Sequence, residues 1–214
     1  MDKNQIRVNQ LIETGRILYD RGLVVGAAGN ISLMSEEGMI YISASGSRLG
    51  CMSSEDVVVI APDGTVLTGE TKPTSEYLLH TLIYRHYSDI KVVLHTHSPF
   101  ATAVAVNREP IQPIVDEMTI LLGGSLDVTE YGAPGTEDLA NKAIDALGDK
   151  KAVLLANHGA VVTGTSIEDA LKIAELVEHV SQVFLYAKIA GCIHEISKDA
   201  FETQRKIYLK KRKV

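Results

Sequence analysis

The stretch that decides the fold is residues 92–106, VVLHTHSPFATAVAV. It reads as a buried strand that ends at His95, with His97 shortly after, and then a second apolar run. Side chains two residues apart on a strand point to the same face, roughly 6–7 Å apart. Two imidazoles so placed can reach one ion with bonds of ~2.0–2.1 Å. The pattern suggests a metal site. Taken alone, it is also explained by histidines that are exposed or that form hydrogen bonds within the protein.

The amino-acid composition limits the classes of protein to which this chain can belong. With 214 residues and 45% hydrophobic side chains, the chain can bury a sizeable core, and we expect one domain over residues 1–214. A formal net charge of −6 argues against binding to nucleic acid, and the basic run at 210–213 is expected to be a solvated tail. Cys51 and Cys192 make no disulfide framework. No apolar run approaches the ~20 residues of a membrane span, so we expect a cytoplasmic protein with no membrane partner.

The order of predicted elements favours one fold class. Strands are predicted at 30–33, 39–43, 56–60, 65–67, 91–95, 152–156 and 160–163. Helices are predicted at 2–21, 74–87, from 99, 116–122, 136–147, from 166 to about 190, and 198–212. The early strands form a meander, and helices gather between and after the later ones. This order predicts an α/β protein with a mixed, largely antiparallel sheet between helical layers, and not a doubly wound parallel sheet.

Two further side chains complete a possible ligand set. His158 stands at the exit of a second apolar strand, in AVLLANHGAVV, and Glu76 stands in KPTSEYLLH at the start of a predicted helix. Three imidazole nitrogens and one carboxylate oxygen suit Zn²⁺ or a similar divalent ion. Taken alone, Glu76 is equally an ordinary acid at a helix start. The remaining histidines lie on or just after predicted helices and are interpreted as structural or exposed: His80, His86, His179 and His194.

Five short motifs in a fixed order carry a family resemblance. They are AAGNIS (27–32), SASGS (43–47), KPTSE (72–76), HTHS (95–98) and NHGAVV (157–162). Together they resemble the class II aldolase/adducin-head family over almost the whole chain. The resemblance implies a single three-layer α/β/α domain, commonly a homotetramer with active sites at subunit interfaces.

The resemblance also implies a role for each ligand. The matching residues of the aldolases make Glu76, His95, His97 and His158 the zinc site, with Mn²⁺ or Co²⁺ as other possible ions. Glu76 would also be the proton-transferring base. Cleaving a ketose phosphate between C3 and C4 leaves an anion, which a Lewis acid can stabilise without a Schiff-base lysine.

A phosphate site is implied by the same motifs. The matching family segments hold the substrate phosphate with amides and hydroxyls at Gly29, Asn30, Ser45, Gly46, Thr74 and Ser75. A helix start is suited to an anion, although each set taken alone is an ordinary turn or cap. Ala27 departs from the pattern, because fuculose-specific members have a threonine there that contributes to phosphate binding.

The expected activity is zinc-dependent aldol cleavage of a ketose 1-phosphate, such as fuculose 1-phosphate or a related deoxy sugar, to dihydroxyacetone phosphate and an aldehyde. A sugar-phosphate dehydratase acting on methylthioribulose 1-phosphate is the alternative, although such relatives typically lack the carboxylate at position 76. A 4-epimerase is less favoured, because its extended C-terminal histidine and tyrosine region is not found. A non-enzymatic head like that of adducin is least favoured, because all four ligands are present.

Two residues are further catalytic candidates through the resemblance. Glu117 aligns with a tyrosine that aldolases contribute across the subunit interface, and dehydratase relatives have an acid/base glutamate there. Tyr208 aligns with a tyrosine on a mobile C-terminal segment that closes over the substrate. A helix-surface glutamate and a tyrosine that packs the last helix are the alternative interpretations.

Overall fold

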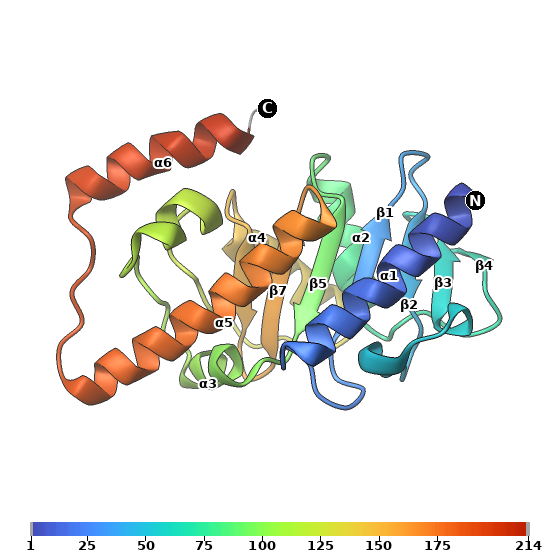
Figure 1. Ribbon diagram of the computed structural model, residues 1–214, viewed down its shortest axis with the longest axis horizontal. Coiled ribbons are helices and arrows are strands. Elements are labelled where there is room, and N and C mark those ends of the chain that lie inside the picture. Colours follow the sequence, from blue (N-terminus) through green and yellow to red (C-terminus); the bar gives the residue numbers. More distant parts are fainter. Residues whose placement is uncertain (1, 213–214) are drawn as a thin grey trace.

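The computed structural model describes residues 2–212, and a seven-stranded sheet forms its centre (Figure 1). The strand order is β4-β3-β2-β1-β5-β7-β6, and neighbouring strands are antiparallel. An isolated parallel bridge between Val128 and Leu154 adds one parallel pairing to this otherwise antiparallel arrangement. The strands are β1 (Asn30–Met34), β2 (Ile40–Ser43), β3 (Val57–Ile60), β4 (Val66–Thr68), β5 (Val92–Thr96), β6 (Ala152–Leu155) and β7 (Gly159–Gly164).

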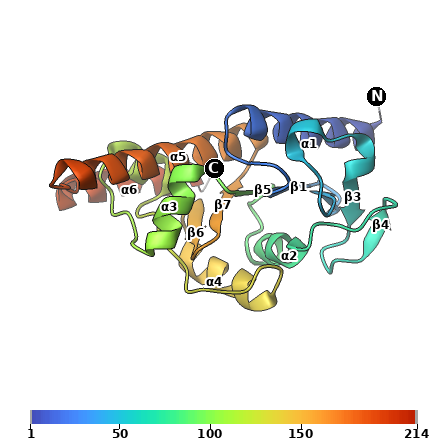
Figure 2. The same ribbon diagram turned by 90° about the horizontal axis from the view of Figure 1, so that it is seen from below.

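Helices cover both faces of the sheet (Figure 2). One face carries α1 (Lys3–Asp20), α3 (Pro99–Asn107) and α5 (Ile167–Ala190), and the other carries α2 (Tyr77–His86) and α4 (Glu137–Leu147). Short turns η1 (Leu49–Cys51) and η2 (Ser54–Asp56) precede β3, and the π-helical turn η3 (Met118–Leu122) lies under the last helix, α6 (Lys198–Arg212). The predicted α/β fold class with a largely antiparallel sheet is confirmed.

The central strand β5 explains why the sheet is covered on both sides. Val92 and Leu94 belong to the core under α1 and α5, whereas Val93 belongs to the core over α2 and α4. Val93 and Leu94 are both 0% exposed. Each such side chain contributes about 1.5–3 kcal/mol when it is fully buried. An uninterrupted apolar run of this kind therefore fits a strand packed on both faces, and the run stops where the histidines begin.

One helix begins later than its sequence predicts. The prediction placed residues 74–87 in a helix, but α2 begins at Tyr77. The amide of Thr74 donates to the carbonyl of Ser43 at 3.0 Å, which ties this segment to the end of β2. That pairing keeps residues 74–76 outside the helix, so they lie at the sheet edge ahead of it.

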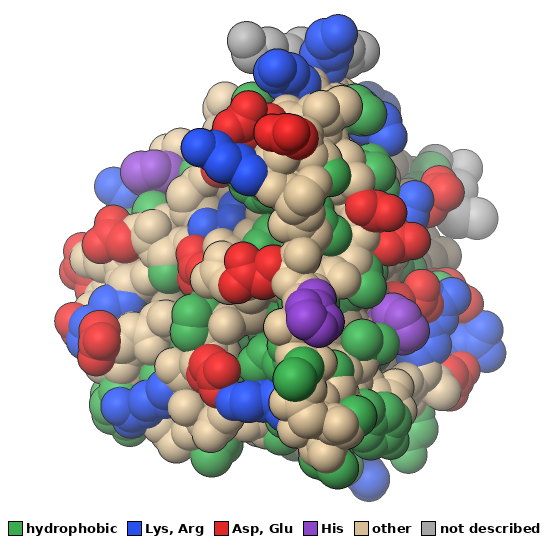
Figure 3. All heavy atoms as spheres, turned by 90° about the vertical axis from the view of Figure 1, so that its left-hand side faces the viewer, with side chains coloured by type: hydrophobic (Ala, Val, Ile, Leu, Met, Phe, Trp, Pro, Cys, Tyr) green, Lys and Arg blue, Asp and Glu red, His purple; other side chains and the backbone are tan. Residues whose placement is uncertain are grey.

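The surface shows mixed charge on the side where α6 and the end of α5 lie. In Figure 3, cationic and anionic side chains are interspersed with hydrophobic ones across this face. The predicted basic tail is partly fixed, because the guanidinium of Arg212 donates to the Asp89 carboxylate at 3.4 Å; Lys213 lies outside the described residues. Within residues 2–212, no helix is both long and apolar enough to cross a membrane.

Candidate metal centre and active-site cavity

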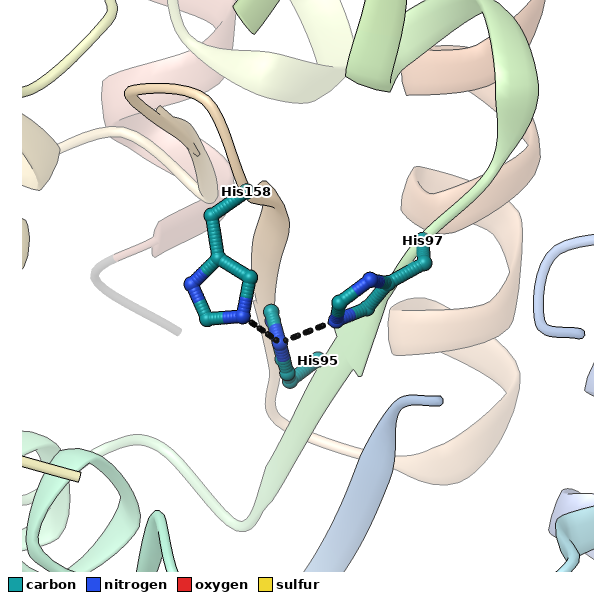
Figure 4. Close-up of side chains that lie close together, drawn as sticks. All are labelled: His95, His97 and His158. Carbon is teal, nitrogen blue, oxygen red and sulfur yellow. Dashed lines mark hydrogen bonds between the residues drawn. The ribbon is translucent and has the colours of Figure 1, made fainter. Parts of the chain in front are cut away.

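Three imidazoles converge where β5 ends and the turn between β6 and β7 passes (Figure 4). The Nε2 atom of His95 lies 2.8 Å from Nε2 of His97 and 3.3 Å from Nε2 of His158. All three side chains offer a nitrogen to a common point, with these atoms within 4.8 Å of one another. The two-residue spacing of His95 and His97 thus places both on one face, as the sequence predicts.

The local backbone explains how His158 reaches the others. Thr96 pairs with Ala160 across β5 and β7, which brings the β6–β7 turn beside the end of β5. Asn157 adopts a left-handed φ of 58° just before the histidine. A Cβ at Gly159 would lie 2.3 Å from the carbonyl oxygen of Thr96. Only glycine permits this approach, so the Asn-His-Gly sequence is required for the geometry.

Glu76 brings a carboxylate to the same point. Its Oε2 atom lies 3.2 Å from Nε2 of His95, and its Oε1 atom lies 3.7 Å from Nε2 of His158. The side chain is buried, and Asn30 donates to Oε2 at 2.8 Å. Oε1 is buried with no hydrogen-bond partner among the described residues. Such an atom is costly unless a cation or donor meets it.

The donor set fits a divalent metal ion. The Nδ1 atom of His95 lies 3.0 Å from the carbonyl of Ala160, so it carries the proton and Nε2 presents a lone pair. That lone pair faces two imidazole nitrogens and a carboxylate, an arrangement that a cation stabilises. Tetrahedral Zn²⁺ with bonds of ~2.0–2.1 Å separates its ligand atoms by roughly 3.3–3.4 Å. The spacings around His95 Nε2 are close to this.

Burial sets the protonation states at this point. Burial, together with the neighbouring His95, lowers the pKa of both His97 and His158 to about 4. Burial opposes ionisation of Glu76, but positive charge at the position of His95 Nε2, supplied by a protonated ring or by a bound cation, and the N–H of Asn30 hold the carboxyl pKa of Glu76 well below the usual range. Neutral imidazoles and an ionised carboxylate are the forms that ligate metals.

A cavity of about 190 Å³ opens beside these ligands. Glu76, His97 and His158 line it, while His95 is fully buried beneath. The residues predicted to bind phosphate also line it: Gly29, Asn30, Ser45, Gly46, Thr74 and Ser75. Hence one small space contains both predicted sets, which come from segments far apart in the sequence.

Glu117 and Tyr208 lie away from that cavity within one chain. Glu117 is exposed at the residue before η3. Tyr208 is 2% exposed, and its hydroxyl donates to the carbonyl of Asp149 at 2.6 Å. A Cβ at Gly123 would lie 2.7 Å from the Tyr208 ring, so this tyrosine packs closely on the end of η3. The packing interpretation of Tyr208 therefore describes the single chain, and a catalytic role requires a neighbouring subunit.

The sequence interpretation assigned no function to His80. This side chain is 0% exposed, and its Nε2 lies 2.5 Å from Oδ1 of Asn30, the residue that donates to Glu76. The available signal was its position four residues after Glu76, which places both near one face of a helix. Its partners are about fifty positions earlier in the chain, so spacing alone did not identify them.

Comparisons with known proteins point to one family. The model described as Class II Aldolase and Adducin N-terminal domain matches residues 9–185. A 5-deoxy-D-ribulose 1-phosphate aldolase from Bacillus thuringiensis serovar kurstaki is 34% identical over 198 residues, 92% of each protein. A 3-oxo-tetronate 4-phosphate decarboxylase from Haemophilus influenzae is 34% identical over 183 residues, 81% of this chain and 84% of that protein. A solved L-fuculose 1-phosphate aldolase has a TM-score of 0.91 at 30% identity, over 98% of each chain.

These matches agree with the geometry of the site. The family match spans all four candidate ligands, from Glu76 to His158. The solved structure shares the fold across nearly the full chain. The predicted resemblance and the prediction of an enzyme of the class II aldolase type are both confirmed. The chain belongs to the Class II Aldolase and Adducin N-terminal domain family.

Proposed function

We propose that this chain is a Zn²⁺-dependent aldolase that cleaves a ketose 1-phosphate to dihydroxyacetone phosphate and an aldehyde. His95, His97, His158 and Glu76 would hold the ion. The observation that supports this most is the convergence of three imidazole nitrogens and a buried, ionised carboxylate at one wall of a cavity. The names of two similar proteins, a deoxyribulose-phosphate aldolase and a fuculose-phosphate aldolase, support the reaction class.

The side chains divide the chemistry among them. The bound ion supplies a Lewis acid that stabilises negative charge on the ketose oxygens as the C3–C4 bond breaks. Glu76 is the group placed to move a proton at C3, because its Oε1 has no protein partner among the described residues. The imidazoles of His97 and His158, whose pKa values are lowered to about 4, are neutral at pH 7 and do not compete for that proton.

Other residues that line the cavity are suited to the substrate phosphate. Gly29 and Gly46 have left-handed φ values of 89° and 77°, a conformation that exposes backbone amides in tight turns. Thr74 and Ser75 add hydroxyls just before α2. Ala27 also lines the cavity, and it supplies no hydroxyl where fuculose-specific members have one. We propose that a phosphate binds here through amides and hydroxyls, with fewer side-chain contacts than in those members.

Other reactions share this scaffold, and Glu76 separates them. The dehydratase alternative typically lacks a carboxylate at this position, whereas here the carboxylate is buried beside His95. A decarboxylase reaction is suggested by the name of one relative. Its 3-oxo acid substrate would need no proton removed at C3. Aldol cleavage gives a role to Glu76 as well as to the histidines and the predicted phosphate-binding residues of the cavity. The 4-epimerase and the non-enzymatic head are not supported by any contact in the described chain.

A substrate panel tests this proposal. Zinc-loaded protein is incubated with 5-deoxyribulose 1-phosphate, fuculose 1-phosphate, methylthioribulose 1-phosphate and 3-oxo-tetronate 4-phosphate. We expect dihydroxyacetone phosphate from a deoxy-ketose 1-phosphate, with no activity after chelation and recovery on adding Zn²⁺. A diketo phosphate product would instead identify a dehydratase, and CO₂ release from the tetronate would identify a decarboxylase. Far less than one divalent ion per chain, with no gain on adding zinc, would contradict the metal site.

The proposal extends to the assembly. A homotetramer in the cytoplasm would place Glu117 and Tyr208 of one chain near the cavity of the next. The exposure of Glu117 and the position of α6 on η3 are compatible with a contribution across an interface.

A further inference from the structure

A chain of buried hydrogen bonds leads from the far side of β1 to the candidate base. The Oγ atom of Ser32 lies 2.7 Å from Nδ1 of His80, and the hydroxyl of Tyr84 donates to the carbonyl of Ser32 at 2.9 Å. His80 Nε2 lies 2.5 Å from Oδ1 of Asn30, and Asn30 Nδ2 donates to Glu76 Oε2 at 2.8 Å. The four residues beyond Glu76 are all buried.

The hydrogen bond from Asn30 to Glu76 fixes the direction of the bonds that connect Asn30, His80 and Ser32. Asn30 Nδ2 donates to Glu76 Oε2, so the amide turns its nitrogen toward Glu76 and its oxygen toward His80. Its oxygen then needs a donor, which must be Nε2–H of His80. Burial lowers the pKa of His80 to about 3, so the ring is neutral and carries a single proton. Its Nδ1 atom therefore accepts, and the hydroxyl of Ser32 donates to it.

A purely structural role explains this arrangement poorly. A fully buried imidazole costs free energy unless both nitrogens are paired, and an apolar side chain of similar size avoids that cost. Here both nitrogens are paired, and one partner lines the active-site cavity. Without a donor from His80, the Asn30 amide could rotate and present its oxygen to the carboxylate.

We propose that His80 is a positioning residue: it holds the Asn30 amide with its nitrogen toward Glu76 and the cavity. This keeps one N–H on the carboxylate and leaves the second N–H available for an oxygen of the substrate. The catalytic consequence of this inference rests on the proposed function. The orientation of the Asn30 amide does not depend on it.

Kinetics of matched variants test the consequence. His80→Phe removes the donor at similar volume, and we expect kcat to fall roughly 10–100-fold with one metal ion per chain retained and KM changed far less. His80→Gln keeps an N–H near the position of Nε2 and should restore most of kcat. In an Asn30→Ala background, His80→Phe should cost nothing further in kcat, because His80 acts through Asn30. Additive losses in that cycle, or no rescue by Gln, would overturn the proposal.

A control variant separates positioning from general destabilisation. Thr81 is buried next to His80 on α2, and its hydroxyl donates to the carbonyl of Leu78 in the same helix. Thr81→Ala should lower Tm and leave kcat unchanged. Equal losses of kcat in Thr81→Ala and His80→Phe would show that only the packing of α2 matters.

The orientation can be measured without any activity. In protein labelled with ¹⁵N-histidine, nitrogen shifts and two-bond couplings should show His80 as the Nε2–H tautomer between pH 6 and pH 8. An Nδ1–H tautomer would overturn the inference even if the aldolase activity is found. Conversely, a chain that cleaves none of the panel substrates refutes the proposed function, and the tautomer measurement still decides the orientation of Asn30.

Discussion

His158 is the single residue on which the metal site depends most, because it alone comes from the β6–β7 turn. Replacing it with alanine leaves two imidazoles and Glu76, and because the proposal uses Glu76 to move a proton, only two ligands are then dedicated to the ion. We expect His158→Ala to retain little zinc and almost no turnover, while circular dichroism shows a normal fold because the two cores do not include it. The control His86→Ala changes an exposed histidine on α2 and should leave zinc content unchanged. Full zinc occupancy in His158→Ala would refute the assignment.

Glu76 should separate metal binding from proton transfer. Glu76→Gln keeps the shape and a carbonyl oxygen but loses the base, so turnover should fall by on the order of 10²–10⁴-fold. Zinc content should fall much less, because three imidazoles remain. Metal analysis and a pH–rate profile measure the two effects. If the profile keeps both its shape and its height in this variant, the proton-transfer role is wrong.

Which parts were predictable depends on the distance between partners in the sequence. His95 and His97 were found because a strand has a period of two, and His158 because it ends an apolar run. The pair Asn30–His80 was missed, because no local period connects a strand residue to a helix residue fifty positions later. Such contacts depend on how distant segments pack together in the fold, and this packing cannot be read from a single sequence.

At the level of elements, a tertiary contact between residues far apart in the sequence also determines where α2 begins. The pattern in residues 74–87 is helical, but a hydrogen bond from Thr74 to Ser43 on β2 holds the first residues out of the helix. The displacement has a functional result, since Thr74 and Ser75 line the cavity instead of turning into the helix. The meander of the early strands and the helical layers were predictable from the order of the elements, whereas this boundary was not.

The element α6 offers the next prediction. It packs on η3, where Arg205 donates to the carbonyl of Gly123 and the Tyr208 hydroxyl donates to the carbonyl of Asp149. Removing residues 205–214 should lower turnover while metal and tetramer are retained, because η3 loses its support and the segment predicted to close over the substrate is deleted. Tyr208→Phe keeps the ring and removes only the hydroxyl, which donates to the Asp149 carbonyl in its own chain; lower turnover in this variant would mean that α6 releases the hydroxyl to a neighbouring site. Wild-type turnover in the truncated chain would leave Tyr208 as a packing residue only.

At the scale of the whole molecule, the cavity of one chain lacks a second group that could take the proton of the C4 hydroxyl as that hydroxyl becomes the aldehyde. Within the described residues, its walls supply hydroxyls, amides, imidazoles and Glu76, which is already assigned to C3. A second proton-transferring group must come from elsewhere, and Glu117 is exposed just before η3, where a neighbouring chain could receive it. An assembly with shared sites follows from the proposal, and it can be tested by mixing subunits.

Glu117→Gln should lose on the order of 10²–10⁴-fold in turnover, the usual contribution of a positioned acid/base. Zinc content and oligomeric state should not change, since Glu117 belongs to neither the ligand set nor the cores. His158→Ala is inactive for a different reason, so the two variants can be unfolded and refolded together. In a cyclic tetramer, about one quarter of the sites then combine intact ligands with an intact Glu117 from the next chain. We expect the mixture to recover roughly that share of wild-type turnover, whereas a mixture as inactive as its parents would mean that Glu117 does not act across an interface.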